Sequence, residues 1–504
     1  MAAFIIAAIC VMAYFLYYKL CNTYLYWEKK GIKGPTPQLL YGNFKTVITL
    51  KDSVNSYAVR LYKEYPNEKF IGLYQGVIPV LIVRDPDLIK KVLVKDFAYF
   101  ADRGFSLTNE PLSKNLFSLD GEEWKVLRQK LTPLFSTSKL KQMMPLLNNC
   151  VTQYMQHLDK VVDQQGPHEV RELNVKYTLK AITSVAFGID IDTFTDNRNE
   201  FIVMAEKLFA PRGLLRRIAV FIDGIKPGIF KQLGITLSPK EIRDFFINLV
   251  RQIIQEREGK PKVRKDFMDL MIELKEQGTI TNGKTEGVTE MEITVEIITA
   301  QALIFYAAGF ETSSGTMSFM LYELSFNQSA QDRCYDEIKQ IMEKYKGELT
   351  YEALNELEYV SAAFDETLRK HPTGGLLLRQ CVSNYRIPEM NFTIEKGTKL
   401  FITLQAIHND PQYFPDPEKY DPTRFLPENR VSKENNVYMP FGEGPRNCIG
   451  LRLAKIQSML GIAHFLYNFR VTPSERTPKV MRYDPRIILL KSMDGIWLNI
   501  ERRS

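Results

Sequence analysis

The chain of 504 residues holds only six cysteines and five histidines, and neither type is clustered. The cysteines have no even spacing and form no Cys-x-x-Cys pair, which argues against a disulfide framework and against a cysteine-rich zinc site. No histidines stand at metal-ligand spacing. We therefore expect no zinc site and a chain that suits a reducing compartment.

Loops that bind nucleotide phosphates are also missing. No Gly-x-Gly-x-x-Gly follows a strand-like run and no Gly-x-x-x-x-Gly-Lys-Ser/Thr occurs, so we expect neither a dinucleotide nor ATP bound through a standard loop. The formal charge of +7 comes from dispersed basic residues without interleaved aromatics, which argues against nucleic-acid binding. No linker and no repeat follows residue 40, so residues 41–504 are expected to form one domain that could bury a bulky cofactor.

The N-terminus carries a long hydrophobic run. Residues 1–18, MAAFIIAAICVMAYFLYY, are uncharged, and as a helix they would extend about 27 Å, close to the thickness of a bilayer core. A cleaved signal peptide would have a basic start and a small-residue cleavage site, and this segment has neither. Aromatics and lysines follow it, which predicts a cytosolic flank. We expect a membrane anchor over 1–22 and a basic, proline-containing hinge over 23–40; a buried core helix is the alternative.

The remaining pattern predicts a mainly α fold with small β-sheets, an α+β arrangement. Two β-branched runs within 68–86 and the runs 398–407 and 486–492 are typical of short strands. Apolar residues at helical spacing predict helices over 241–257 and 293–325, whereas 276–290 has the composition of an exposed loop.

The segment FGEGPRNCIG, residues 441–450, surrounds Cys448 with glycines and one arginine. A lone cysteine is more often a small buried hydrophobe than a ligand. Here, however, the glycines allow positive φ and a close approach to a flat group, and backbone N–H groups could stabilise a thiolate. Arg446 suits a carboxylate, and a helix begins after Gly450 with an N-terminus that favours negative charge. These features describe a cysteine-ligated haem b.

The same segment resembles the cytochrome P-450 superfamily, whose signature is Phe-x-x-Gly-x-x-x-Cys-x-Gly. Phe441, Gly444, Cys448 and Gly450 occupy its fixed positions, and Cys448 would be the axial ligand of the haem iron. The resemblance covers nearly the whole chain. The residues and spacing of its motifs are most similar to those of insect microsomal enzymes of the detoxifying clade, family 6-like. It implies the cytochrome P-450 fold with an N-terminal transmembrane anchor.

Residues 308–313, AGFETS, place polar groups inside an apolar helix, which costs helix stability. Alone, this could be a solvated face or a kink. The resemblance implies instead the acid–alcohol pair of the family. Thr312 would hydrogen-bond oxygen and an ordered water, and Glu311 would help to relay protons. Since neighbours on a helix point about 100° apart, Thr312 is the better candidate for direct contact.

A second motif is Glu-x-x-Arg, at Glu366 and Arg369, three residues apart on one helix face. An exposed pair of this kind would be worth little. The resemblance implies a buried structural pair behind the cysteine loop, completed by Arg424 of the sequence PTRF. Threonine stands there in place of the more common glutamate.

The resemblance also implies contacts to the haem propionates. Trp124 and Arg128 match the family's Trp-x-x-x-Arg, and Arg379 and Arg446 match the other usual contacts. Arg103, in the sequence FADRGF, is a further candidate for such a contact. Two carboxylates in an apolar interior need such partners.

By the same resemblance the protein is a monooxygenase that receives electrons from NADPH–cytochrome P-450 reductase and in some members from cytochrome b5. We expect it in the endoplasmic reticulum membrane with its catalytic domain in the cytosol. Basic residues that could dock the reductase are Lys125, Lys130, Arg452 and Lys455. Residues in segments that line family pockets are Phe105, Leu107, Leu116, Phe305, Leu376, Leu377 and Leu378, although such residues are often plain core. They imply an apolar substrate, either xenobiotics such as plant toxins or insecticides, or a hormone, steroid or fatty acid.

Three other functions are kept open. An isomerase or dehydratase of the same fold commonly lacks the distal threonine, which is present here as Thr312. A membrane-tethered haem carrier or gas sensor would need the cysteine but not the polar pair at 311–312. A helical scaffold would bind no haem at all.

Overall fold

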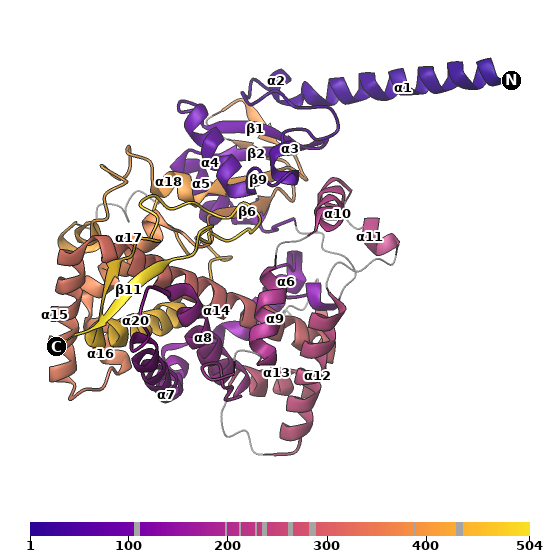
Figure 1. The fold of residues 1–504 in the computed structure, drawn as a ribbon. Helices are drawn as coiled ribbons and strands as arrows, with labels where there is room; N and C mark the ends of the chain where they lie inside the picture. Colours follow the sequence, from indigo (N-terminus) through magenta and orange to yellow (C-terminus); the bar gives the residue numbers. More distant parts are fainter. Residues whose placement is uncertain are drawn as a thin grey trace.

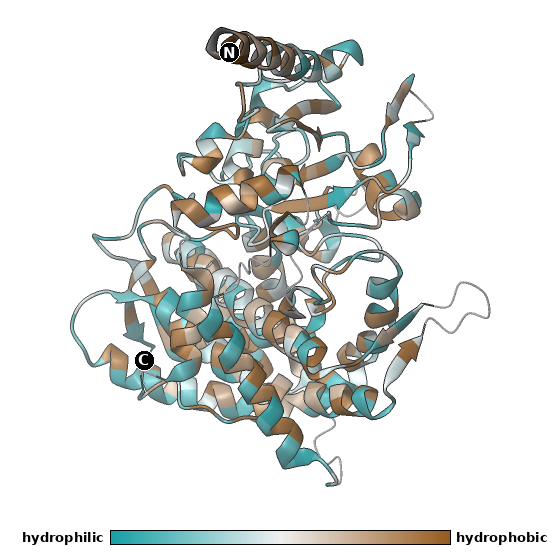
Figure 2. Cartoon of the chain, turned by 90° about the vertical axis from the view of Figure 1, so that its right-hand side faces the viewer, coloured by the Kyte–Doolittle hydropathy of each residue, from teal (hydrophilic) through white to brown (hydrophobic). Residues whose placement is uncertain are grey.

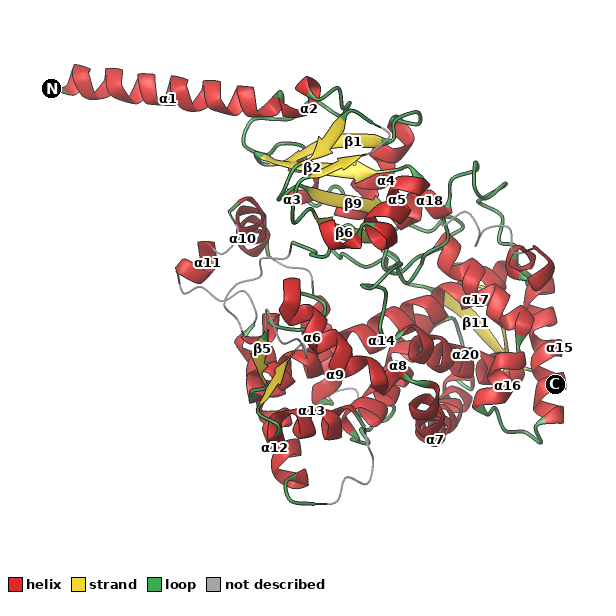
Figure 3. Cartoon of the chain, turned by 180° about the vertical axis from the view of Figure 1, so that it is seen from behind, coloured by secondary structure: helices red, strands yellow, loops and turns green. Residues whose placement is uncertain are grey.

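The structure is a computed structural model. It describes residues 1–104, 111–196, 199–210, 213–226, 229–233, 239–260, 266–281, 289–387, 390–429 and 437–503. A largely helical body fills most of the molecule, and a four-stranded sheet lies at the end from which the N-terminal helix projects (Figures 1 and 3). The mainly α architecture with small sheets that the sequence predicts is confirmed.

The four-stranded sheet joins two distant parts of the chain. The hairpin of β1 (Phe70–Gln75) and β2 (Ile78–Val83) is antiparallel, and β2 pairs in parallel with β9 (Lys399–Thr403). Strand β6 (Leu376–Gln380) completes the order β1-β2-β9-β6. The β-branched and aromatic residues of these runs favour strands, and most of them are buried.

The helical body is built around α14 (Val295–Phe326), which packs against α8 (Val170–Ile182), α12 (Lys240–Arg257) and α20 (Leu451–Asn468). Apolar residues surround α14 on nearly all sides, as expected of a helix buried in a large core. The Thr294 hydroxyl caps its start by accepting from the Ile297 N–H.

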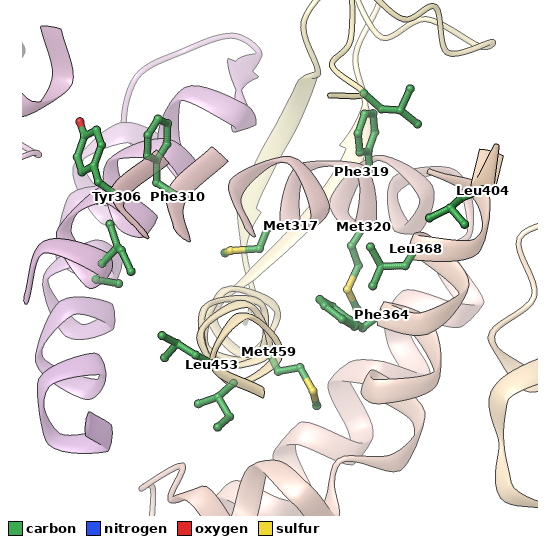
Figure 4. Packing of buried hydrophobic residues seen from close by; sticks show 14 of the residues in the cluster. Tyr306, Phe310, Met317, Phe319, Met320, Phe364, Leu368, Leu404, Leu453 and Met459 are labelled. Carbon is green, nitrogen blue, oxygen red and sulfur yellow. The ribbon is translucent and has the colours of Figure 1, made fainter. Parts of the chain in front are cut away.

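Methionine, phenylalanine and leucine side chains fill the seam between α14, α17 (Glu358–Lys370) and α20. Figure 4 shows Met317 of α14 near Leu453 and Met459 of α20, and Met320 near Phe364 of α17. All of them are buried. This seam places α20, which follows the cysteine segment, directly against the central helix.

The other elements lie around these. The remaining helices are α2 (Tyr26–Lys29), α3 (Lys45–Ile48), α4 (Val54–Glu64), α5 (Pro86–Lys90), α6 (Gly121–Leu131), α7 (Thr137–Val162), α9 (Glu200–Phe209), α10 (Leu214–Ile225), α11 (Ile229–Gln232), α13 (Phe267–Glu276), α15 (Gln328–Lys344), α16 (Tyr351–Glu356) and α18 (Leu404–His408). The π-helical turns are Lys91–Lys95 and Thr183–Phe187, and the 3-10 turns are Phe97–Tyr99, Pro111–Ser113, Thr132–Phe135, Pro422–Phe425 and Pro427–Asn429. The remaining strands form a sheet in the order β10 (Phe469–Pro473), β11 (Trp497–Arg502), β3 (His168–Glu169), and the pairs β4 (Thr279–Thr281)–β5 (Glu290–Glu292) and β7 (Tyr385–Ile387)–β8 (Phe392–Ile394).

The N-terminal helix α1 (Ala2–Tyr24) projects away from the body (Figure 1). Its segment Phe4–Tyr24 has a mean hydropathy of 2.0, none of it is buried within the protein, and hydrophobic residues run along it (Figure 2). A helix of this length and composition is suited to crossing a membrane. It is not the buried core helix considered as the alternative.

Three secondary-structure predictions need correction. The ends of the predicted loop 276–290 belong to the β4–β5 hairpin, whose register pairs Thr279 with Glu292. The predicted strand 398–407 ends at Thr403, because the Thr403 hydroxyl caps helix α18 by accepting from the Ala406 N–H. The predicted strand 486–492 is irregular, and one isolated bridge, Tyr483–Ser492, stands in its place. The predicted strands at 70–83 and helices near 241–257 and 293–325 are confirmed.

One buried histidine predicts how stability depends on pH. His408 is fully buried, its Nε2 accepts from the Met439 N–H at 3.1 Å, and burial lowers its pKa to about 3. The unfolded chain binds this proton near pH 6.5, so His408 stabilises the fold fully above that pH, and the contribution is lost as pH falls below it. We expect about 1.4 kcal/mol less free energy of unfolding per pH unit below 6 from this group. Urea unfolding at several pH values measures this slope.

The matched variant is His408→Gln, whose amide oxygen can still accept from the Met439 N–H but does not titrate. Its free energy of unfolding should fall less steeply between pH 6.5 and pH 4.5 than that of the natural protein. Equal slopes in the two proteins would show that His408 is not the group responsible.

Candidate active site

The cysteine segment forms a tight loop before α20. The Cys448 N–H donates to the Phe441 carbonyl at 2.9 Å, and Gly442 and Gly444 both adopt φ of +72°. A Cβ on Gly444 would lie 1.8 Å from the Leu93 carbonyl oxygen, so only glycine fits at this close approach. Phe441 is half-buried against the core.

Gly450 departs from the expectation of positive φ. It has φ of −89° and is the N-cap residue of α20, which begins at Leu451. A Cβ there would meet Phe135 at 3.8 Å, an ordinary contact. Its backbone N–H faces the Cys448 thiol and lowers the pKa of that thiol.

The Cys448 side chain is accessible, yet protein groups surround it closely enough that burial raises the pKa of its thiol. The Gly450 N–H and the charges of Arg128 and Arg103 act in the opposite direction and lower this pKa. A bound metal ion would deprotonate such a thiol outright.

Three arginines gather beside the cysteine. Burial and the neighbouring charges of Arg379 and Arg446 lower the pKa of Arg103 to about 9. Burial likewise lowers the pKa of Arg379 and of Arg446 to about 10, with mutual repulsion contributing at Arg379. All three therefore stay charged at neutral pH.

The guanidiniums of Arg379 and Arg446 are only partly satisfied. Within the described part of the chain, Nε of both residues and Nη1 of Arg446 have no hydrogen-bond partner although they are buried. Unpaired buried donors of this kind are costly and fit an anionic group. The guanidinium carbon of Arg446 lies over the ring of Trp124, 4.1 Å from the ring centroid. These residues fit the two carboxylates of a haem.

Arg103 and Arg446 also bind the segment that leads into α6. Arg103 donates to the Phe117 carbonyl at 2.7 Å and to the Arg446 carbonyl at 3.3 Å. Arg446 donates to the Leu119 carbonyl at 2.8 Å and to Asp120 Oδ1 at 3.3 Å. The pocket-lining candidates Phe105 and Leu107 lie outside the described residues.

Arg128 is placed differently from Trp124, although both lie on α6. Its guanidinium donates to the carbonyl and to Oδ1 of Asn447 at 3.0 and 2.9 Å. Arg128 therefore fastens α6 to the residue before Cys448. The sequence analysis missed Asn447, because nothing in the local pattern shows a contact between residues 319 positions apart.

The polar pair of α14 splits between two faces. The Thr312 hydroxyl donates to the Ala308 carbonyl at 2.7 Å, and Ala308 is exposed although α14 runs through the middle of the molecule. This face of α14 is thus not packed against protein. Glu311 instead points toward α8 and forms an ion pair with Arg171. The sequence analysis also missed Arg171.

The Glu366–Arg369 pair is fully buried on α17. Arg369 Nε and Nη2 donate to the two carboxylate oxygens at 2.7 and 2.9 Å, a bidentate arrangement. Arg424 Nε lies 3.6 Å from Glu366 Oε1, so the structure brings the three predicted residues together. It is not an exposed surface pair.

The other pocket and docking candidates are spread over several elements. Phe305 packs edge-on against Phe135 and Phe267, Leu116 is buried, and Leu376, Leu377 and Leu378 lie half-buried on β6. Among the docking candidates, Lys125 pairs with Glu122 and Lys455 lies 3.5 Å from Asp365. Arg452 is exposed and Lys130 is half-buried.

No three His, Cys, Asp or Glu side chains in the described part of the chain come together to hold a metal ion. A metal at Cys448 would therefore need ligands that protein side chains do not supply. Iron in a porphyrin brings four nitrogen ligands of its own, which fits a single cysteine.

Comparisons with known proteins agree with this site. Residues 32–498 match the family model of cytochrome P450. The chain is 36% identical to cytochrome P450 6B7 of Helicoverpa armigera over 498 residues, 99% of this chain and 98% of that protein. It is 37% identical to cytochrome P450 6B1 of Papilio polyxenes over 510 residues, covering 99% and 100%. It is also 36% identical to cytochrome P450 6a2 of Drosophila melanogaster over 514 residues, covering 99% of each. With a haem-thiolate site and this similarity along its length, the chain belongs to the cytochrome P450 family and is a monooxygenase.

Proposed function

We propose that this monooxygenase inserts one oxygen atom of O₂ into apolar small molecules, chiefly xenobiotics such as plant toxins or insecticides. Electrons come from NADPH through a separate reductase. The observation that carries the proposal is the accessible Cys448 thiol beside the buried, partly unpaired guanidiniums of Arg379 and Arg446. That combination fits a haem and its carboxylates.

When bound, the haem supplies the oxygen-activating chemistry, which a cysteine thiolate favours by donating electron density. The protein contributes position and protons. Arg103, Arg379 and Arg446 hold the carboxylates, and the Gly450 N–H stabilises the sulfur. Thr312, on the open face of α14, orients a water beside the reacting oxygen, and Glu311 supplies protons.

Apolar residues of α14 and β6 support this substrate class. Phe305 is held by two aromatic neighbours, and β6 presents three half-buried leucines. Such a lining favours an apolar ligand. The xenobiotic role rests on the similarity to family 6 members, and an endogenous hormone, steroid or fatty acid is the second candidate.

The sequence contains no standard loop for a nicotinamide or nucleotide cofactor, so a separate protein supplies the electrons. We assign this role to NADPH–cytochrome P450 reductase, with cytochrome b5 as a second donor. Arg452 and Lys130, together with Lys125 and Lys455, provide positive charge for an acidic partner.

The proposed location is the endoplasmic reticulum membrane. Residues 1–22 anchor the chain, 23–40 form the hinge, and 41–504 form the catalytic domain on the cytosolic side. Carbonate extraction of microsomes tests this: the full chain should stay in the membrane, and a chain without residues 1–22 should be released in larger part. Complete release of the full chain would contradict the anchor.

The test of function uses the full-length, haem-loaded protein with reductase, NADPH, isotope-labelled O₂ and a panel of apolar compounds. We expect products that carry one labelled oxygen and that require both reductase and NADPH. Rearranged products without NADPH would indicate an isomerase. No product from any compound, despite correct haem binding, would indicate a carrier or sensor.

A further inference from the structure

A buried histidine lies where α14, the end of α17 and the C-terminal part of the chain meet. His371 directly follows α17, is 4% exposed, and stacks on the ring of Phe319 of α14 with the ring centroids 4.7 Å apart. Its two ring nitrogens have different partners. Nε2 lies 2.6 Å from Glu323 Oε1 of α14, and Nδ1 lies 2.7 Å from the Tyr483 hydroxyl. The imidazole therefore bridges the central helix and a segment 112 positions further along the chain.

The chemistry of the three groups fixes the direction of both hydrogen bonds. Burial alone would raise the pKa of Glu323, but the hydrogen bonds and charges of His371 and Lys370 outweigh it and lower this pKa. Glu323 is thus a carboxylate that can only accept, and His371 Nε2 carries the proton. Burial lowers the pKa of His371 more than Glu323 raises it, so the ring is neutral at neutral pH. Nδ1 of a neutral ring protonated at Nε2 accepts, and the Tyr483 hydroxyl donates to it.

Tyr483 lies at the base of a short loop, residues 484–491. The Asp484 N–H closes this loop by donating to the Lys491 carbonyl at 2.9 Å. Within the loop, Ile488 is 75% exposed, which is unusual for a large apolar side chain. Because Tyr483 immediately precedes the loop, its hydrogen bond to His371 sets where the loop begins.

The loop lies beside the segment that leads into β6 and near the polar pair of α14. The Leu490 N–H donates to the Thr373 carbonyl at 3.0 Å, just before β6 begins. Thr373 in turn packs on α14, since a Cβ on Gly315 would lie 3.2 Å from its methyl group. Lys491 interacts electrostatically with Glu311. The loop and the half-buried leucines of β6 are therefore neighbours beside the central helix.

We propose that His371 is a positioning residue for substrate selectivity, because it holds the base of the loop 484–491 through Tyr483. With the loop held in this place, Ile488 and the leucines of β6 together limit the size of the apolar substrate. The inference deepens the proposed function and rests on it, since it takes β6 to be part of the substrate pocket. The observation that carries it is the buried hydrogen-bonded chain Glu323–His371–Tyr483 between α14 and the loop.

The alternative is that the cluster only stabilises the fold. The two roles can be separated, because one ring nitrogen faces α14 and the other faces the loop. In His371→Gln the amide NH₂ takes the place of Nε2 and still donates to Glu323, whereas Tyr483 loses its acceptor. In His371→Asn the amide oxygen takes the place of Nδ1 and still accepts from Tyr483. Glu323 then loses one donor and keeps Lys370, which lies 2.9 Å away.

The experiment uses the full-length, haem-loaded protein. The shift of its Soret band on ligand binding gives the Kd of two apolar probes, naphthalene and the larger pyrene, without reductase or turnover. Hydrogen exchange of the peptide that covers residues 484–491 reports the loop directly, and urea unfolding reports stability. The variants are His371→Gln, His371→Asn, Tyr483→Phe and the double variant His371→Gln with Tyr483→Phe.

The matched control is His408→Gln. His408 is also fully buried, and its ring packs against Phe414 and Tyr438. Its Nε2 accepts from the Met439 N–H at 3.1 Å, a bond that the glutamine amide oxygen can keep. This variant therefore replaces a second buried histidine without touching the chain that leads to the loop.

We expect the ratio of the naphthalene Kd to the pyrene Kd to rise about fivefold in His371→Gln and in Tyr483→Phe, which each lose one hydrogen bond. The small probe loses its contact with the displaced loop, while the large probe still reaches it. Exchange of the loop should be faster in the same two variants by about the same factor. The double variant should show no more than either single variant, because both remove the same bond.

His371→Asn should keep the natural Kd ratio and the natural exchange of the loop, but it should unfold at lower urea. His408→Gln should leave the ratio and the loop unchanged. If His371→Gln does not load haem, Tyr483→Phe, which removes a single hydroxyl, carries the comparison.

A natural Kd ratio in both His371→Gln and Tyr483→Phe would overturn the inference while leaving the monooxygenase function in place. An equal rise in His371→Asn or in His408→Gln, or a double variant whose effects multiply, would do the same. Binding of neither probe to the natural protein would overturn the proposed apolar pocket, and the inference with it. The two failures are therefore distinguishable.

Discussion

Replacing Cys448 with serine is expected to reduce substrate oxidation to the level of a sample without enzyme. It should also remove the red-shifted Soret band that thiolate ligation gives to the reduced, carbon monoxide-bound form. Serine is nearly isosteric, so the loop of residues 441–450 should keep its turn, in which the Cys448 N–H binds the Phe441 carbonyl. An un-ionised hydroxyl, however, donates far less electron density to iron than a thiolate.

The surroundings of Cys448 favour a thiolate. We therefore expect serine substitution at another cysteine to leave the Soret band and substrate oxidation in place. The Gly450 N–H and the charges of Arg128 and Arg103 lower the pKa of the Cys448 thiol. The matched control is Cys150→Ser on α7, where burial raises the pKa of the thiol to about 11. We expect Cys150→Ser to keep both the band and the activity. A thiolate-type spectrum in Cys448→Ser would contradict the assignment.

The cysteine loop could be predicted from sequence because its requirements are local. The positive φ of Gly442 and Gly444 favours glycine whatever else the chain does. The close approach of Gly444 to the Leu93 carbonyl is a further, long-range reason that only the structure shows. Gly450 shows the limit of that reasoning. A glycine in a loop does not have to adopt positive φ. Gly450 has φ of −89° and is the N-cap residue of α20.

Contacts between distant residues were much harder to predict. Arg171 and Glu311 are 140 positions apart, and neither has a neighbour in sequence that shows the pairing. The interaction exists because α8 and α14 meet at Gly309, which tertiary packing decides. The contact of Arg128 with Asn447 was equally hidden, because these two residues are 319 positions apart.

Strand predictions failed where pairing partners were missing. Residues 486–492 carry the apolar composition of a strand, but only Tyr483 and Ser492 form a bridge there. Conversely, the composition of residues 276–290 is typical of a loop, although strands β4 and β5 pair at its ends. The propensity of a short run is a weak predictor, because a strand is stabilised by the neighbours against which it packs.

The buried pair of α17 gives the largest expected effect on stability. Glu366 and Arg369 are fully buried, and Arg369 also donates to the His408 carbonyl at 3.0 Å and the Pro417 carbonyl at 2.7 Å. The Asp421 N–H donates to Glu366 Oε1 at 2.9 Å. The pair therefore connects α17 to α18 and to the segment that carries Arg424. Removing one charge leaves the other buried without its opposite charge.

We therefore expect Glu366→Gln to lower the free energy of unfolding by about 3–5 kcal/mol, a large share of the about 5–15 kcal/mol that stabilises a typical fold. Haem loading should fall in parallel, since the cysteine loop follows this segment. The control is Glu122→Gln, which breaks the ion pair with Lys125 at the same spacing on an exposed face. It should cost less than about 1 kcal/mol. Urea unfolding measures both, and equal losses would mean that burial does not give the Glu366–Arg369 pair its importance.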